Sequence, residues 1–335
     1  MKRRTDASIF ITETKFSEMR HLTNELSEIT RCRLTLTEIN ENLVIEKPCG
    51  RTASEDLAEF MCSSNTLRSV TISITGRRWD AHNYNVFYSV LARDASKMKI
   101  ERIEIEYIDL SQRQSASRDL AQFICKMPHL RELILGSYDN RPEFHDEFYS
   151  TLSSLASSAK IEILHHYGNL SQRPSASRDL AQFICKMNHL KNLKLRGYYH
   201  DDFYSTSSSM ASTTKIETLE LDANLSERPS ASRDFAQFIC KMNHLKNLTL
   251  VGYYHDDFYS TASSMASTAK IEILYHNENL SERPSASRDF ARFICKMNHL
   301  KNLTLSGQYH DDFYSTSSSM ASTTKVIYVR RFLHV

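Results

Sequence analysis

The sequence predicts an α/β solenoid, with a parallel sheet of strands on a concave face and helices on the convex face. Residues 169–223 and 224–278 are near copies of one 55-residue segment, and a third copy begins at Asn279. Short stretches of the form apolar-x-x-apolar-x-apolar recur along the chain, and the segments between them have helical periodicity. A fixed period containing one strand and one helix is the sequence signature of a solenoid.

The strands recur at two alternating spacings. Counted from the first apolar residue of each strand, the steps settle to 29 and 26 residues, so one 55-residue copy holds two units. The starting positions are Leu67, Ile100, Leu130, Ile161, Leu190, Ile216, Leu245, Ile271, Leu300 and Val326. Two weaker strands are expected around residues 9–11 and 34–36, which gives about 11 to 12 units in all, with a period typical of leucine-rich repeats.

Two kinds of helix are expected between the strands. In residues 230–245, Phe235, Ile239, Met242 and Leu245 recur at steps of four, three and three, which places them on one face of a helix. We expect Ser232 or a neighbouring serine to cap this helix, because serine accepts hydrogen bonds from the first free amides. The other connection, residues 255–270, is rich in serine and threonine, so its helices should be shorter or frayed.

These units resemble the leucine-rich repeats of the ribonuclease-inhibitor type, which also alternate two kinds of unit. The resemblance covers nearly the whole chain and implies a horseshoe. Every second unit carries the asparagine that the family places after the strand, at Asn169, Asn224 and Asn279. The resemblance implies that these side chains bond to neighbouring backbone turns as a ladder. The other units carry Tyr138, Tyr198, Tyr253 and Gln308 there, so only half of the ladder is expected.

One stretch narrows the resemblance further. Residues 120–135 read LAQFICKMPHLRELIL, which is most like the repeat tails of nucleotide-binding (NACHT) leucine-rich-repeat receptors of innate immunity. In those receptors the tail senses ligands or holds the molecule inactive, while a separate module binds nucleotide. That module is not in this sequence, so the resemblance implies no nucleotide or other cofactor here.

Composition is that of an ordinary globular chain. Its 335 residues are 41% hydrophobic and 24% charged, and we expect one leucine-rich-repeat domain over residues 1–335. Irregular units are expected in 1–66, regular units in 67–325 and an atypical end in 326–335, where a docking or missing segment is inferred. No apolar run is long enough for a membrane span or a signal peptide, which predicts a cytoplasmic or nuclear protein. The net charge of +2 does not favour nucleic acid or a membrane surface.

No pattern in the sequence indicates catalysis or a metal site. The register cysteines occupy the same helix position in every second unit; they are Cys125, Cys185, Cys240 and Cys295. Neighbours in this set stand two units apart, roughly 10 Å, which is too far for a disulfide bond. The His-Asp-Asp triplets at 200–202, 255–257 and 310–312 fit helix N-terminal capping better than metal binding. Strand alternation turns His165 outward and His166 into the core. A non-enzymatic protein is therefore predicted.

Differences between the near copies indicate where function lies. Residues 169–223 and 224–278 differ at 11 of 55 positions. Five of the six outward strand positions differ, against six of the other 49. The changed outward pairs are Lys194 and Thr249, Arg196 and Val251, Thr218 and Ile273, Glu220 and Tyr275, and Asp222 and Asn277. Drift would scatter changes over all exposed positions, so this pattern predicts a recognition surface on the concave face.

The concave face is mixed in character, which bears on its partner. Acidic, basic and aromatic positions alternate without a long basic stripe, so a folded protein fits better than a nucleic acid. Tyr167, Arg196 and Tyr275 are the expected anchors. The predicted partner-binding residues are Arg102, Glu104, Ile134, His165, Tyr167, Lys194, Arg196, Glu220, Asp222, Val251, Tyr275 and Asn277. An enzyme regulator, such as a nuclease inhibitor or a GTPase activator, and a structural assembly scaffold remain alternatives.

Overall fold

The computed structural model describes residues 67–73, 81–137 and 142–320, the strand backbones at 34–37 and 42–45, and positions 55, 58–59 and 61–62. The predictions for residues 9–11 and 326–335 lie outside the described residues. The chain divides into two compact units, Met1–Gly168 and Asn169–Val335.

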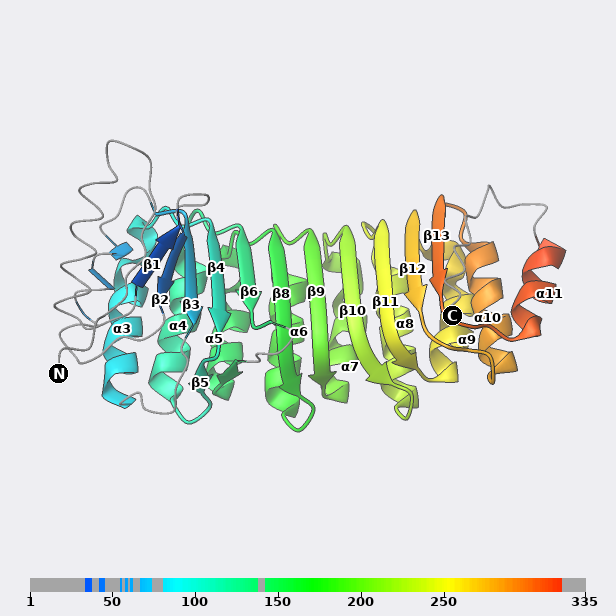
Figure 1. Ribbon diagram of the computed structural model, residues 1–335, viewed down its shortest axis with the longest axis horizontal. Coiled ribbons are helices and arrows are strands. Elements are labelled where there is room, and N and C mark those ends of the chain that lie inside the picture. The colour runs from blue at the N-terminus through cyan, green and yellow to red at the C-terminus, as the bar shows by residue number, and fades with distance from the viewer. Residues whose placement is uncertain are drawn as a thin grey trace. The chain divides into compact units, whose positions relative to one another are not determined.

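The first unit contains a sheet flanked by helices (Figure 1). Its strands are β1 (Leu34–Thr37), β2 (Asn42–Ile45), β3 (Ser69–Ser73), β4 (Arg102–Glu106), β6 (Glu132–Leu135) and β8 (Ile163–Leu170), whose last two residues belong to the second unit. Neighbouring strands from β2 to β8 pair in parallel, whereas β1 pairs with β2 antiparallel. The strand expected near residue 35 is therefore present, but in the opposite direction to the others. The helices are α3 (Ala81–Asp94), α4 (Gln114–Lys126) and α5 (Asp146–Leu155), and β5 (Asp109–Leu110) and β7 (Glu143–Phe144) form a separate small pair.

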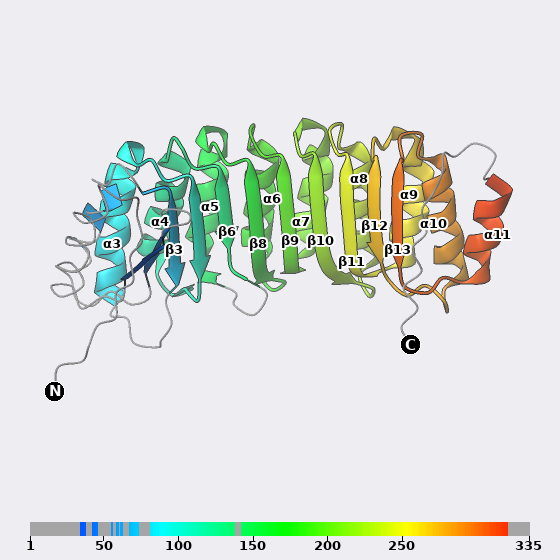
Figure 2. The same ribbon diagram turned by 45° about the horizontal axis from the view of Figure 1, so that its top comes forward.

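The second unit repeats the strand and helix regularly. Its strands are β9 (Asn192–Tyr199), β10 (Thr218–Leu225), β11 (Asn247–Tyr254), β12 (Ile273–Asn277) and β13 (Asn302–Ser306), all paired in parallel. Its helices are α6 (Pro174–Lys186), α7 (Asp201–Met210), α8 (Pro229–Lys241), α9 (Asp256–Met265), α10 (Pro284–Lys296) and α11 (Asp311–Met320). Figure 2 shows these helices behind one side of the sheet. In each unit, the side of the sheet away from its helices, here called the sheet face, carries the outward strand residues. This is the α/β leucine-rich-repeat architecture that the period predicts.

The core is formed by the buried face of each helix and the inward side chains of the strands. On α8 and just after it, Phe235, Ile239 and Met242 are each at most 1% exposed, as their spacing predicts. On β11, Leu248 and Leu250 are buried while the alternate residues are partly exposed. The helices of the second connection are 10 residues long against 13 for the first, and α7 and α9 end in a turn of 3-10 helix. The expectation of shorter helices there is confirmed.

The prediction that Ser232 caps its helix is wrong. The helix begins at Pro229, after Arg228, and no side chain caps it. Proline suits the first helical position, because the nitrogen there has no acceptor within the helix. Ser232 lies inside the first turn, donates its hydroxyl to the Leu225 carbonyl over 3.1 Å and accepts the His255 amide over 3.1 Å. It ties the strand end of one repeat to the connection of the next.

The asparagine ladder does not form. Asn224 is exposed, and its Oδ1 accepts from the Ser226 amide at 3.2 Å and the Ser226 hydroxyl at 2.8 Å. Asn169 does the same with Ser171. Each side chain closes its own turn, as asparagine often does, and leaves the neighbouring turn untouched. In this respect the chain departs from the ribonuclease-inhibitor type.

The His-Asp-Asp triplets cap helices and also join them. His200 precedes α7, and its Nδ1 accepts the Asp202 amide over 3.2 Å, which confirms the capping prediction. The aspartates also bind arginines of the flanking helices, a role that was not predicted from the sequence. Arg178 of α6 contacts Asp202, and Arg228 before α8 contacts Asp201. The pattern recurs at Arg233 with Asp257 and at Arg288 with Asp312. These arginine–aspartate ion pairs, here called the helix clasps, join successive helices.

Candidate functional site

The structure places eleven of the twelve predicted recognition residues partly exposed on the sheet face. Their strands show strict alternation of buried and partly exposed positions, as in β9 and β10. Ile134 departs from the pattern, since it is only 7% exposed. It lies in register between Glu104 of β4 and His165 of β8.

In the first unit, the sheet face carries a small ion cluster. Arg102 contacts Glu104 on its own strand at 3.3 Å and Glu132 on β6 at 3.2 Å. Burial, together with the nearby charge of Glu104, raises the pKa of Glu106 at the end of the same strand. His165 and His166 divide as expected, with His166 buried at 1% exposure. Its Nε2 lies 3.4 Å from the Tyr149 hydroxyl, and burial lowers the pKa of the imidazole to about 3, so the ring is neutral.

In the second unit, the charged positions of β9 and β10 neutralise one another. Lys194 lies 2.7 Å from Glu220, and Arg196 lies 2.5 Å from Asp222. Both pairs sit directly opposite in the strand register. Partly exposed pairs of this kind contribute about 0.2–1 kcal/mol each. A partner that used Arg196 as an anchor would therefore have to compete with Asp222 or bind the pair as a whole.

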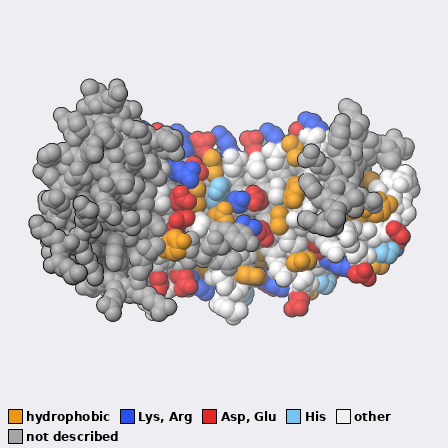
Figure 3. Space-filling model, viewed as in Figure 1, with side chains coloured by type: hydrophobic (Ala, Val, Ile, Leu, Met, Phe, Trp, Pro, Cys, Tyr) orange, Lys and Arg blue, Asp and Glu red, His pale blue; other side chains and the backbone are white. Residues whose placement is uncertain are grey.

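The next three strands carry no charge on the sheet face. We call these outward residues the neutral patch: Asn247, Thr249 and Val251 of β11, Ile273, Tyr275 and Asn277 of β12, and Asn302, Thr304 and Ser306 of β13. Tyr275 stands at its centre, in register with Thr249 on one side and Thr304 on the other. Ile273 is 43% exposed, which is high for a large apolar side chain. In Figure 3, red and blue side chains lie over β9 and β10, and orange and white ones over the strands that follow.

Of the three predicted anchors, Tyr167 belongs to the first unit, and Arg196 and Tyr275 belong to the second. Within the second unit, Arg196 is on β9 and Tyr275 is on β12, with two strands between them. Tyr275 has the surroundings expected of an anchor, because its register neighbours Thr249 and Thr304 are uncharged.

Two further functional candidates, which the sequence did not predict, lie directly beneath the neutral patch. His276 and Glu278 are buried, at 0% and 3% exposure, on the inward side of the segment that carries Tyr275 and Asn277. The signal was available, because the other copy has Leu221 and Ala223 at these positions. These two inward differences adjoin the outward ones.

The described part of the chain offers no metal or disulfide chemistry. No three histidine, cysteine, aspartate or glutamate side chains converge there. Cys125, Cys185 and Cys240 are free and buried, and burial raises the pKa of each thiol to about 12. Cys295 is free and half-buried. Over the same residues, no helix has the length and apolarity needed to cross a bilayer.

Comparison with known proteins adds little on function. No family model matches the chain, and no curated protein matches it. Among solved structures, the chain is similar to the leucine-rich repeat-containing protein LegL7 from Legionella pneumophila. The identity is 11%, the match covers 85% of this chain and 99% of that one, and the TM-score is 0.38. A likeness this distant carries no functional argument.

Proposed function

We propose that the protein is a non-catalytic recognition module that binds a protein partner through the sheet face, with the neutral patch as its main contact. The observation that carries this proposal is the uneven distribution of differences between the copies. Five of six outward strand positions changed between residues 169–223 and 224–278, while the exposed arginines and aspartates of the helix clasps did not. A constant frame with a varied face is what recognition by a solenoid requires.

The charge distribution supports a partner with an uncharged, partly apolar surface. The charges on β9 and β10 are already paired, so they offer little net attraction to a charged ligand. The neutral patch supplies an aromatic centre, two aliphatic side chains and a rim of amides and hydroxyls. Aromatic anchors with a polar rim are typical of the energetic centre of protein interfaces.

Narrower roles belong to the same proposal. The resemblance of residues 120–135 to receptor tails supports ligand sensing or autoinhibition in a cytoplasmic, innate-immune-type receptor. An enzyme regulator would use the same face, and its partner would then be the enzyme. A pure assembly scaffold differs, since it does not depend on which residues the face carries.

Photocrosslinking tests the proposal. A photoreactive amino acid is placed at position 275 on the sheet face and, as a control, at the exposed Ser264 on α9. We expect position 275 to capture one protein reproducibly that position 264 does not capture. If both positions capture the same proteins, or position 275 captures none in cells that express the protein naturally, the sheet face is not the recognition surface.

A further inference from the structure

The buried pair His276 and Glu278 is specific to the second copy, residues 224–278. The first copy places Leu221 and Ala223 there, and the repeat before it places His166 and Gly168. A buried carboxylate is costly unless hydrogen bonds and an opposite charge compensate for its lost hydration. The contacts of Glu278 therefore show what this copy has acquired.

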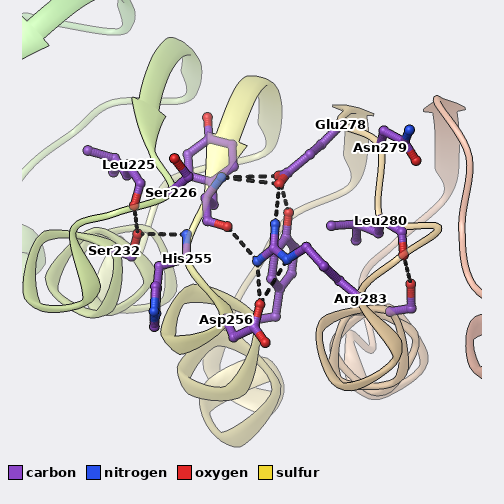
Figure 4. A network of polar contacts seen from close by, with 12 residues as sticks. Leu225, Ser226, Ser232, His255, Asp256, Glu278, Asn279, Leu280 and Arg283 are labelled. Atoms are coloured by element: carbon purple, nitrogen blue, oxygen red, sulfur yellow. Dashed lines mark hydrogen bonds and ion pairs between the residues drawn. The ribbon is translucent and has the colours of Figure 1, made fainter.

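Glu278 accepts hydrogen bonds from three elements. Arg283, at the entry to α10, donates from Nη1 over 2.6 Å. The Tyr254 amide of β11 donates over 3.2 Å to one carboxylate oxygen and lies 3.3 Å from the other. Tyr259 of α9 donates its hydroxyl to Oε2. Arg283 is itself held by Asp256 and by the Tyr254 carbonyl, at 2.9 and 2.6 Å, and Figure 4 shows its guanidinium between Glu278 and Asp256.

The carboxylate coincides with a break in the sheet. β10 and β11 pair over eight positions, from Thr218 opposite Asn247 to Leu225 opposite Tyr254. β12 and β13 pair over five, ending at Asn277 opposite Ser306, and meet again only as one bridge between Leu280 and Tyr309. The missing pairs are those of Glu278 and Asn279, so side-chain bonds take over where the strand stops.

A chain of hydrogen bonds leads from this carboxylate toward the surface. Tyr259 Oη lies 3.1 Å from His276 Nε2, and His276 Nδ1 lies 2.8 Å from Tyr309 Oη. When Glu278 is ionised, the Tyr259 hydroxyl donates its hydrogen bond to the carboxylate. His276 must then donate from Nε2 to Tyr259 and accept from Tyr309 at Nδ1. Tyr309, at 8% exposure, is the outermost member.

We propose that Tyr309, His276, Tyr259 and Glu278 form a proton relay beneath the neutral patch, and that its direction reverses when Glu278 takes up a proton. A proton from water enters at Tyr309 Oη, which passes its own proton to His276 Nδ1. His276 passes the Nε2 proton to Tyr259, and Tyr259 passes its proton to Oε2 of Glu278. Each intermediate residue gains one proton and loses one, so the net change is one proton on Glu278.

The groups that face Glu278 favour this titration near neutral pH. Burial raises the pKa of Glu278 to about 7, although the Tyr259 hydroxyl, the Arg283 charge and the Tyr254 amide lower it. Burial, with the Arg283 charge, lowers the pKa of His276 to about 3, so the ring relays protons while staying neutral. Burial, with the Glu278 charge, raises the pKa values of Tyr259, Tyr254 and Tyr309. Asp256 faces Arg283 on the side away from Glu278.

The relay links pH to the recognition surface. His276 lies between Tyr275 and Asn277 on β12, and these neighbours point to the sheet face. This consequence for binding rests on the proposed function, whereas the relay itself does not. The relay is therefore tested without a partner.

Nitrogen NMR of the histidine side chains in the full chain tests the relay. We expect the His276 proton to move from Nε2 at pH 8.5 to Nδ1 at pH 5.5, with a midpoint near 7 and no charged imidazolium. The His276→Leu variant, which carries the residue of the first copy, assigns the signal. His166, whose segment has Gly168 in place of a carboxylate, should show no such switch.

The Glu278→Gln variant provides a second test of the relay. Its amide oxygen faces Arg283 and its amide nitrogen faces Tyr259, so His276 should hold its proton on Nδ1 at every pH. A single unchanging tautomer in the wild type, or a switch that persists in Glu278→Gln, overturns the relay. If the variant does not fold, the wild-type titration decides. Hydrogen exchange adds a readout, because linkage from 4.5 to about 7 predicts that residues 278–283 open roughly 30-fold more at pH 8.5 than at pH 5.5.

Discussion

Two tyrosines at equivalent positions of the repeats offer a direct test of how hydrogen bonding of a buried hydroxyl affects stability. Tyr204 and Tyr259 are both buried, and each ring lies 5.6 Å from an arginine, Arg228 or Arg283. The Tyr259 hydroxyl contacts His276 and Glu278. The Tyr204 hydroxyl has no hydrogen-bond partner among the described residues. The two sites therefore differ mainly in whether the hydroxyl is satisfied.

Replacing each tyrosine by phenylalanine isolates that difference. A buried hydroxyl without a partner costs about 1–3 kcal/mol, so Tyr204→Phe should raise the free energy of unfolding by about 1 kcal/mol. Tyr259→Phe should lower it by about 1–3 kcal/mol, because it removes a donor from Glu278 and leaves His276 Nε2 without its acceptor. The ring packing stays the same in both variants.

Urea unfolding followed by circular dichroism measures both effects, and hydrogen exchange of α7 and α9 locates them. We expect opposite signs for the two variants. If Tyr204→Phe destabilises the protein as much as Tyr259→Phe does, then the Tyr204 hydroxyl has a partner and the reasoning is refuted.

Three further outcomes are expected. Glu278→Gln should flatten part of the pH dependence of the urea midpoint. Because the pKa of Glu278 is raised, its contribution to stability is fully present below pH 4.5 and is lost as pH rises through about 7. The urea midpoint of the wild type should therefore fall more between pH 5 and 8 than that of the variant. Gly252→Ala should destabilise by about 2 kcal/mol or more, since φ is +116° and a Cβ would lie 2.0 Å from the Ala223 oxygen; unchanged thermal unfolding would contradict this. Among the register cysteines, Cys295 should react first with a thiol reagent under native conditions, as mass spectrometry can show, because Cys125, Cys185 and Cys240 are buried with pKa values near 12.

Local patterns were enough to predict the architecture. The spacing of Phe235, Ile239 and Met242 identifies the buried helix face, and strand alternation separates Leu248 from Thr249. Both follow from the geometry of a single element and need no knowledge of its neighbours. The period then orders the strands.

Contacts between repeats were harder to predict. Ser232 is a good N-cap by residue type, yet the proline start of α8 places it inside the helix, where it bonds to the next repeat. The asparagine ladder failed because Asn224 finds acceptable partners within its own turn. Ser232 takes a partner in the next repeat in place of the local one, whereas Asn224 takes a local partner in place of the neighbouring turn, and propensity alone does not predict either choice.

In the candidate site, too, features of a single strand were predicted and contacts between segments were not. Alternation predicted which residues face outward, but the strand register was needed to pair Lys194 with Glu220 and Arg196 with Asp222. The differences at His276 and Glu278 were visible in the sequence. Their meaning depends on Tyr259, Arg283 and Tyr309, which come from three other segments.

Exchanging the outward residues between the copies tests whether the neutral patch binds the partner. The variant Thr249→Lys, Val251→Arg, Ile273→Thr, Tyr275→Glu and Asn277→Asp gives the second copy the outward residues of the first, which the same frame already accommodates. The measurement is the affinity of the folded variant for the protein captured from position 275, beside a control altered at Ser264 on α9. Recognition through the neutral patch predicts at least a tenfold loss, about 1.4 kcal/mol, for the exchanged face and none for the control. Equal affinity of the exchanged face and the wild type would contradict it.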